Sequence, residues 1–141
     1  MNSRPPTCKG CPLYHTGVGY VLGHGPKTAK LALVGEAPGA DEAEAGLPFV
    51  GGAGHILDAL LKQAGIPRKE VFIDNVLRCR PPGNKYPTGK TRTAAESQCR
   101  QYDAIGRSVH PVVVVPLGDK ALKLYTKHSG ITRWRGSILS K

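Results

Sequence analysis

The sequence predicts an α/β fold in which helices cover both faces of a parallel sheet. Three short apolar runs have the composition of buried strands, and each is followed by a loop and then a helical pattern. This alternation is the order that a parallel sheet requires, because each crossover returns the chain to the same edge. The 141 residues contain no internal repeat and no low-complexity linker, so we expect one domain over residues 1–141.

The strands are expected where β-branched and other apolar residues run together. They are Lys30–Gly35, Val71–Val76 and Val112–Leu117. A loop rich in glycine and proline follows the first strand directly, and Gly118 ends the third. Ligands of open parallel sheets bind beyond the carboxyl ends of the strands. We therefore expect the loops at 36–49 and 78–92 to border a common cleft.

The helices are expected between and after these strands. They are His55–Ala64, Thr93–Arg107 and Asp119–Lys127. Gly65 and Pro67 end the first of them, and Asp119 is suited to the N-cap of the last.

The charge of the chain points to a polyanionic partner. Twenty Lys and Arg against ten Asp and Glu give a formal charge of +10, and no acid follows Asp119. One segment holds five basic residues and no acid: Arg78, Arg80, Lys85, Lys90 and Arg92. Such clusters favour nucleic acid, although a basic soluble surface would look the same. No apolar run is long enough to cross a bilayer, so we expect a soluble cytoplasmic protein without a membrane partner.

The four cysteines are Cys8, Cys11, Cys79 and Cys99. Nothing in the sequence signals secretion, so a metal site is favoured over disulfides. The first pair lies in a Gly/Pro stretch with no strand before it, which disfavours a thioredoxin-like redox pair. Four thiolates suit either zinc or an iron–sulfur cluster. A shared metal would attach the amino terminus to the body of the domain.

Several motifs carry a resemblance to a known family. Val34–Glu42 reads VGEAPGADE and is continued by Gly46–Gly54, GLPFVGGAG. Asn75–Asn84 reads NVLRCRPPGN, and Pro111–Gly118 reads PVVVVPLG. In their order and spacing, and with the four cysteines, these motifs resemble those of the family 4 uracil-DNA glycosylases, the iron–sulfur branch of that superfamily. The resemblance runs from about Cys8 to Leu139.

The resemblance implies a three-layer α/β/α fold with a central parallel four-stranded sheet, whose last strand this chain lacks. Members of the family continue into a further strand and a His-Pro loop that supplies a catalytic histidine, whereas this sequence stops at Lys141. His110-Pro111 does not replace that loop, because it precedes the third strand. We expect that the chain is a fragment, that a continuation or partner supplies its end, or that catalysis is impaired.

The implied function is hydrolysis of the N-glycosidic bond of uracil in DNA, single- or double-stranded, as the first step of base-excision repair. The alternative is a catalytically impaired, glycosylase-like DNA-binding module, part of a larger phage or replication protein. A zinc-dependent nucleic-acid adaptor is a third interpretation. The resemblance favours a structural [4Fe-4S] cluster on the four cysteines, with zinc as the alternative, and we expect a monomer.

The resemblance also assigns roles to residues of the first two motifs. Phe49 would stack on the uracil and Asn75 would hydrogen-bond its edge, with Gly35 and Ala37 lining the pocket. Without the resemblance, Phe49 could equally pack in the core. Ala37 stands where many other uracil glycosylases carry a water-activating aspartate.

The catalytic candidates are two carboxylates and an amide. Glu42 would position water or exclude the thymine methyl group, Glu36 would shape the pocket near the base, and Asn84 would hold water or contact DNA. Solvated loop carboxylates and a turn-forming asparagine are the structural alternatives. The basic segment at 78–92 would contact phosphates without sequence preference.

Overall fold

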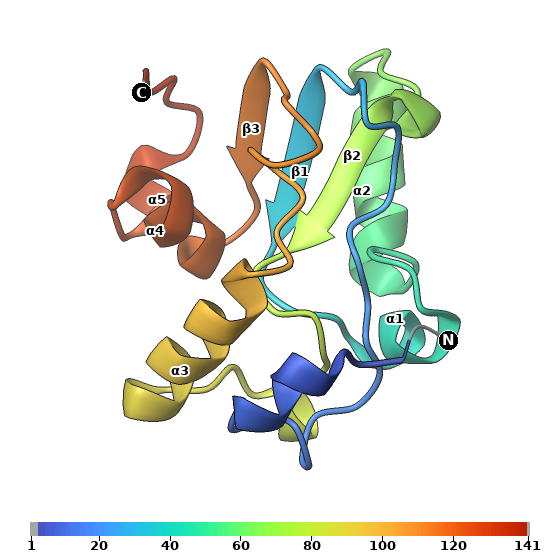
Figure 1. Ribbon diagram of the computed structural model, residues 1–141. Helices are drawn as coiled ribbons and strands as arrows, with labels where there is room; N and C mark the ends of the chain where they lie inside the picture. Colours follow the sequence, from blue (N-terminus) through green and yellow to red (C-terminus); the bar gives the residue numbers. More distant parts are fainter. Residues whose placement is uncertain (1–2, 141) are drawn as a thin grey trace.

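The computed structural model describes residues 3–140 and contains a parallel sheet of three strands (Figure 1). The strands are β1 (Leu31–Gly35), β2 (Val71–Asn75) and β3 (Val113–Pro116), in the order β2-β1-β3. The register pairs Gly35 with Asn75, the last residues of their strands. The predicted α/β class is confirmed, and the sheet within residues 3–140 has three strands, in agreement with the expectation of a four-stranded sheet without its last strand.

Helices and turns cover both faces of the sheet, because successive strand residues point to opposite sides. On one face, Leu33 packs with Leu57 and Leu61 of α2 (Gly52–Gln63). On the other face, Val34 packs with Ala121 of α4 (Asp119–Thr126). The layers of the predicted fold are therefore present. The remaining helices are α1 (Ala40–Ala45), α3 (Gly89–Arg100) and α5 (Ile131–Trp134), with 3₁₀ turns η1 (Pro6–Gly10), η2 (Arg68–Glu70) and η3 (Pro82–Asn84).

The second predicted helix is shorter than expected. It ends at Arg100 rather than Arg107. Residues 102–109 form turns whose apolar side chains pack against strand residues of the sheet. Asp103 helps to end the helix, because its carboxylate accepts a hydrogen bond from the backbone N–H of Ile105 at 3.0 Å. The pattern analysis missed α1, which is too short and too acidic to show an apolar periodicity.

The amino-terminal segment is attached to the body of the domain by hydrogen bonds. Backbone hydrogen bonds join Val18 and Arg80 in both directions, at 3.0 and 2.9 Å. The Gln98 side chain of α3 donates to the carbonyl of Thr7 at 2.7 Å. Figure 1 shows this segment beside α3, at the end of the sheet where the strands terminate. None of the helices within residues 3–140 is long and apolar enough to span a bilayer.

Candidate active site

A pocket of about 470 Å³ lies beyond the carboxyl ends of β1 and β2. It is bordered by the loop after β1, the start of α2 and the loop after β2, so the predicted common cleft is present. Seven of the predicted site residues line it or form its wall: Gly35, Glu36, Ala37, Glu42, Phe49, Asn75 and Asn84.

Gly35 brings the two proposed base contacts together. A Cβ atom on this residue would lie 2.5 Å from Cζ of Phe49 and 2.5 Å from Oδ1 of Asn75. The ring and the amide therefore converge on the same point, and only a residue without a side chain leaves room for both. Asn75 is buried, and its amide has no hydrogen-bond partner among residues 3–140. The amide can therefore serve a ligand in the pocket.

The backbone of Phe49 is left-handed, with φ of 54°. Two contacts hold this uncommon conformation: its carbonyl accepts a hydrogen bond from Arg68 at 2.8 Å, and Gly54 lies so close that a Cβ there would be 2.0 Å from the same oxygen. The glycine and the arginine thus hold the backbone that carries the ring.

Glu42 connects the two loops that border the pocket. Its Oε1 accepts backbone N–H groups of Val50 and Gly51, at 3.0 and 2.8 Å, and its Oε2 accepts that of Gly39 at 3.1 Å. Burial alone would raise the pKa of Glu42, but these hydrogen bonds outweigh it and hold the pKa below the ordinary value. The carboxylate is therefore ionised at neutral pH.

Glu36 and Asn84 are each held by a neighbour. Glu36 Oε1 accepts the backbone N–H of Lys120 at 3.1 Å, which ties the pocket to the start of α4. Asn84 Oδ1 accepts a hydrogen bond from Nε of Arg80 at 2.5 Å, leaving the amide N–H groups of this exposed residue free.

The four cysteines line one small cavity next to the start of the loop after β2. None of them forms a disulfide. Burial raises the pKa of the Cys79 thiol to about 12 and raises the pKa values of Cys8 and Cys99, so these three thiols are neutral unless a cation binds them. Within residues 3–140, no three His, Cys, Asp or Glu side chains are grouped as a single-ion site.

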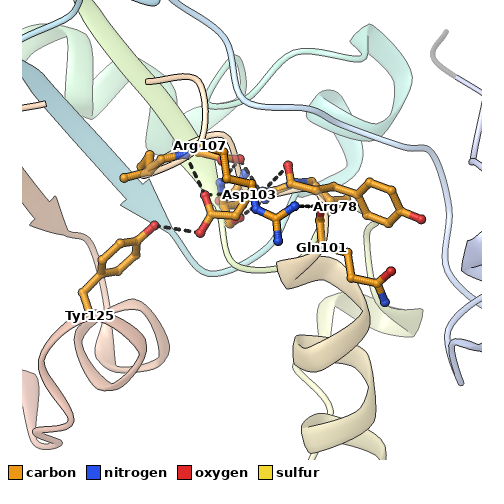
Figure 2. A network of polar contacts seen from close by, with 9 residues as sticks. Arg78, Gln101, Asp103, Arg107 and Tyr125 are labelled. Carbon is orange, nitrogen blue, oxygen red and sulfur yellow. Dashed lines mark hydrogen bonds and ion pairs between the residues drawn. The ribbon is translucent and has the colours of Figure 1, made fainter. Parts of the chain in front are cut away.

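Arg78 lines this cavity and contacts the backbone of the pocket residue Asn75. Its side chain is 3% exposed and pairs with Asp74 at 2.8 Å, and its guanidinium donates to the carbonyl oxygens of Asn75 and, at 3.3 Å, of Tyr102. Figure 2 shows the guanidinium beside Asp103, which also accepts a hydrogen bond from Tyr125 at 3.3 Å. The prediction that Arg78 contacts phosphates is therefore corrected: it is a buried structural residue. Arg80, Lys85, Lys90 and Arg92 remain at the surface, fully or in part.

Comparison with known proteins identifies the family. The family model of the uracil DNA glycosylase superfamily matches residues 22–140. The type-4 uracil-DNA glycosylase of Thermotoga maritima is 37% identical over 139 residues, which cover 97% of this chain and 71% of the relative. The chain belongs to this superfamily. Relatives of the same name in Archaeoglobus fulgidus and Sulfurisphaera tokodaii are 43% and 39% identical, over 79% and 92% of this chain. The chain spans 55% and 60% of their lengths.

Tyr86 is a pocket residue of this glycosylase-family chain that sequence reasoning did not single out. It lines the pocket, and its hydroxyl donates to Glu96 of α3 at 3.0 Å. The signal was present in the sequence as an aromatic side chain within a basic segment. Its position on an irregular loop gave no periodicity from which to place it.

Proposed function

We propose that this chain carries the base pocket of a uracil-DNA glycosylase, which hydrolyses the N-glycosidic bond between uracil and deoxyribose. The observation that carries the proposal is the convergence of the Phe49 ring and the Asn75 amide over Gly35. The names of the curated relatives support the same activity. We propose further that residues 1–141 form a single domain.

In this proposal the uracil enters the pocket after its nucleotide has been flipped out of the DNA. The Phe49 ring supplies an aromatic face for stacking. The Asn75 amide offers one donor and one acceptor, which match the carbonyl and N–H groups on the uracil edge. Because Asn75 is buried at the end of β2, its position is fixed by the sheet rather than by a mobile loop.

Water would be held at the rim of the pocket. Ala37 offers no base, so we assign water positioning to the ionised carboxylate of Glu42, which lines the pocket. The ionised carboxylate would orient the water and stabilise positive charge that develops on the sugar. Glu36 would keep α4 against the pocket, and the free amide N–H groups of Asn84 would bind water or a phosphate oxygen.

We assign the cavity of the four cysteines to a structural [4Fe-4S] cluster. Four thiols without disulfides around one cavity form the ligand set that such a cluster uses. Arg78 lines the same cavity, and its Nε is shielded from solvent without a hydrogen-bond partner in the described part of the chain. Its positive charge and its free N–H suit a negatively charged group there. When bound, the cluster would link the amino-terminal segment to α3 and to the loop after β2.

The activity is tested by measuring free uracil released from a single-stranded oligonucleotide that carries one uracil. The matched control is the same oligonucleotide with thymine. We expect release from the first and none from the second, with the DNA strand left intact until alkali cleaves the abasic site. Binding of both oligonucleotides with no release from either would contradict the proposed hydrolysis.

A further inference from the structure

A second surface feature, a basic groove, lies between α3 and α4. Its volume is about 440 Å³, and neither the pocket nor the cysteine cavity includes it. The groove is lined by five cationic side chains and one carboxylate: Arg92, Arg100, Lys120, Lys123, Lys127 and Glu96. Five positive charges against one negative charge leave a net of four on this surface.

The two helices present these cations in facing rows. Residues 92, 96 and 100 recur every four positions of α3, and residues 120, 123 and 127 recur at intervals of three and four along α4 and its C-cap. Both spacings place side chains on one face of a helix. Glu96 is already paired with Arg92 at 2.7 Å, so it does not neutralise the lysines of α4. Like charges so arranged repel one another unless an anion lies between them.

The basic groove begins at the wall of the pocket. The Tyr86 ring lies 5.8 Å from Nζ of Lys120 and 6.0 Å from Cζ of Arg92, and the same tyrosine lines the pocket. The backbone N–H of Lys120 donates to Glu36 on the pocket side. A polyanion that lies in the groove would therefore reach the rim of the base pocket with no intervening element.

We propose that the basic groove holds the sugar–phosphate backbone of the DNA strand that flanks the flipped nucleotide. This inference rests on the proposed function and adds a strand path to it. Cations dominate the lining, with Leu124 as an apolar residue beside them, and the aromatic residue stands at the pocket end. The contacts therefore suit phosphates rather than stacked bases, and binding in the groove is independent of sequence.

The test is the affinity of the protein for a 20-nucleotide single strand, measured by fluorescence anisotropy at several salt concentrations. The variant is Lys123→Ala with Lys127→Ala, two exposed lysines of the groove. Its matched control is Lys62→Ala with Lys69→Ala, two exposed lysines on α2 and η2, away from both the groove and the pocket. Both variants remove the same charge, and thermal unfolding verifies that both are folded.

We expect the groove variant to bind DNA several-fold more weakly. The plot of log affinity against log salt should also become less steep: its negative slope should shrink in magnitude by about 1.4, which is about 0.7 for each phosphate that the variant no longer neutralises. The control should lose little affinity and keep the slope. Equal losses in the two variants would overturn the proposal, because net charge alone would then explain binding.

Substrate length separates this proposal from the proposed function. On the 20-nucleotide substrate, the groove variant should release uracil more slowly than the wild type. On a trinucleotide, which cannot fill both the pocket and the groove, the difference between the two rates should be smaller. An equal loss on both substrates would contradict the strand path. If the unmodified protein releases no uracil from either substrate, the proposed function fails. The anisotropy measurement would still test whether DNA binds in the basic groove.

Discussion

Nη1 of Arg78 lies 2.8 Å from Oδ1 of Asp74, and both side chains are almost completely buried. Asp74 precedes the pocket residue Asn75, whereas Arg78 precedes the cluster candidate Cys79. Burial raises the pKa of Asp74 to about 6, and the arginine opposes that shift. The ion pair therefore connects a residue next to the pocket with a residue next to the cysteine cavity, and each charge is stabilised by the other.

Replacing Arg78 by methionine should destabilise the fold strongly. The change leaves the Asp74 carboxyl buried without its partner, which costs about 3–5 kcal/mol. Urea unfolding of the variant and the wild type measures the difference. The double variant Arg78→Met with Asp74→Asn should recover part of the loss, since the unpaired charge is gone. A single variant as stable as the wild type would show that the pair contributes nothing.

Gly35→Ala should block the base pocket. The new methyl group would overlap both the Phe49 ring and Oδ1 of Asn75, and such overpacking costs ~1–3 kcal/mol. We expect kcat/KM for uracil release to fall by about 10- to 100-fold. The matched control is Gly10→Ala, where a methyl group meets no atom within 4 Å. Full activity in Gly35→Ala would place the bound base elsewhere.

Glu42 makes the stability of the loops depend on pH. Its pKa is lower in the folded protein than in the unfolded chain, so its contribution is present above about pH 4.5 and is lost as the pH falls through the folded pKa. Glu42→Gln should cost about 1–3 kcal/mol at pH 7 and should flatten this acid dependence. Thermal unfolding from pH 3 to 7 measures both effects. An unchanged pH profile in the variant would remove Glu42 from this role.

Loss of a cysteine ligand should loosen two segments together. In Cys99→Ala, we expect faster hydrogen exchange at residues 8–20 and at residues 78–92, because both segments border the cysteine cavity. The visible absorption of the anaerobically prepared protein should fall in parallel. The sheet residues of β1 should keep their protection. Equal hydrogen-exchange rates in the wild type and the variant at these two segments would argue against a metal centre that both segments share.

Much of the fold and of the pocket could be predicted from the sequence. The strands were found because apolar β-branched runs are distinctive, and parallel topology then places the residues after them at one edge. That reasoning put the loops at 36–49 and 78–92 around a common cleft, and the family resemblance assigned Phe49 and Asn75 to it. The structure adds the reason for a glycine at position 35, which the resemblance placed only in the lining of the pocket.

Other features depend on tertiary contacts that a single sequence does not reveal. Arg78 lies in the basic segment, and only its pairing with Asp74 shows that it is buried. In the sequence, the lysines of α4 showed only as part of a stretch without acids, because the facing row on α3 comes from another part of the chain. Likewise, the three backbone hydrogen bonds that Glu42 accepts join two loops, and their proximity in the fold could not be inferred from their positions in the sequence.

The most direct test is single-turnover uracil release by Asn75→Ala beside the wild type, with DNA affinity measured on the same oligonucleotide. A pocket that reads uracil through this amide predicts a rate lower by about 100-fold or more with nearly unchanged DNA affinity. Release at the wild-type rate would contradict the assignment of the pocket.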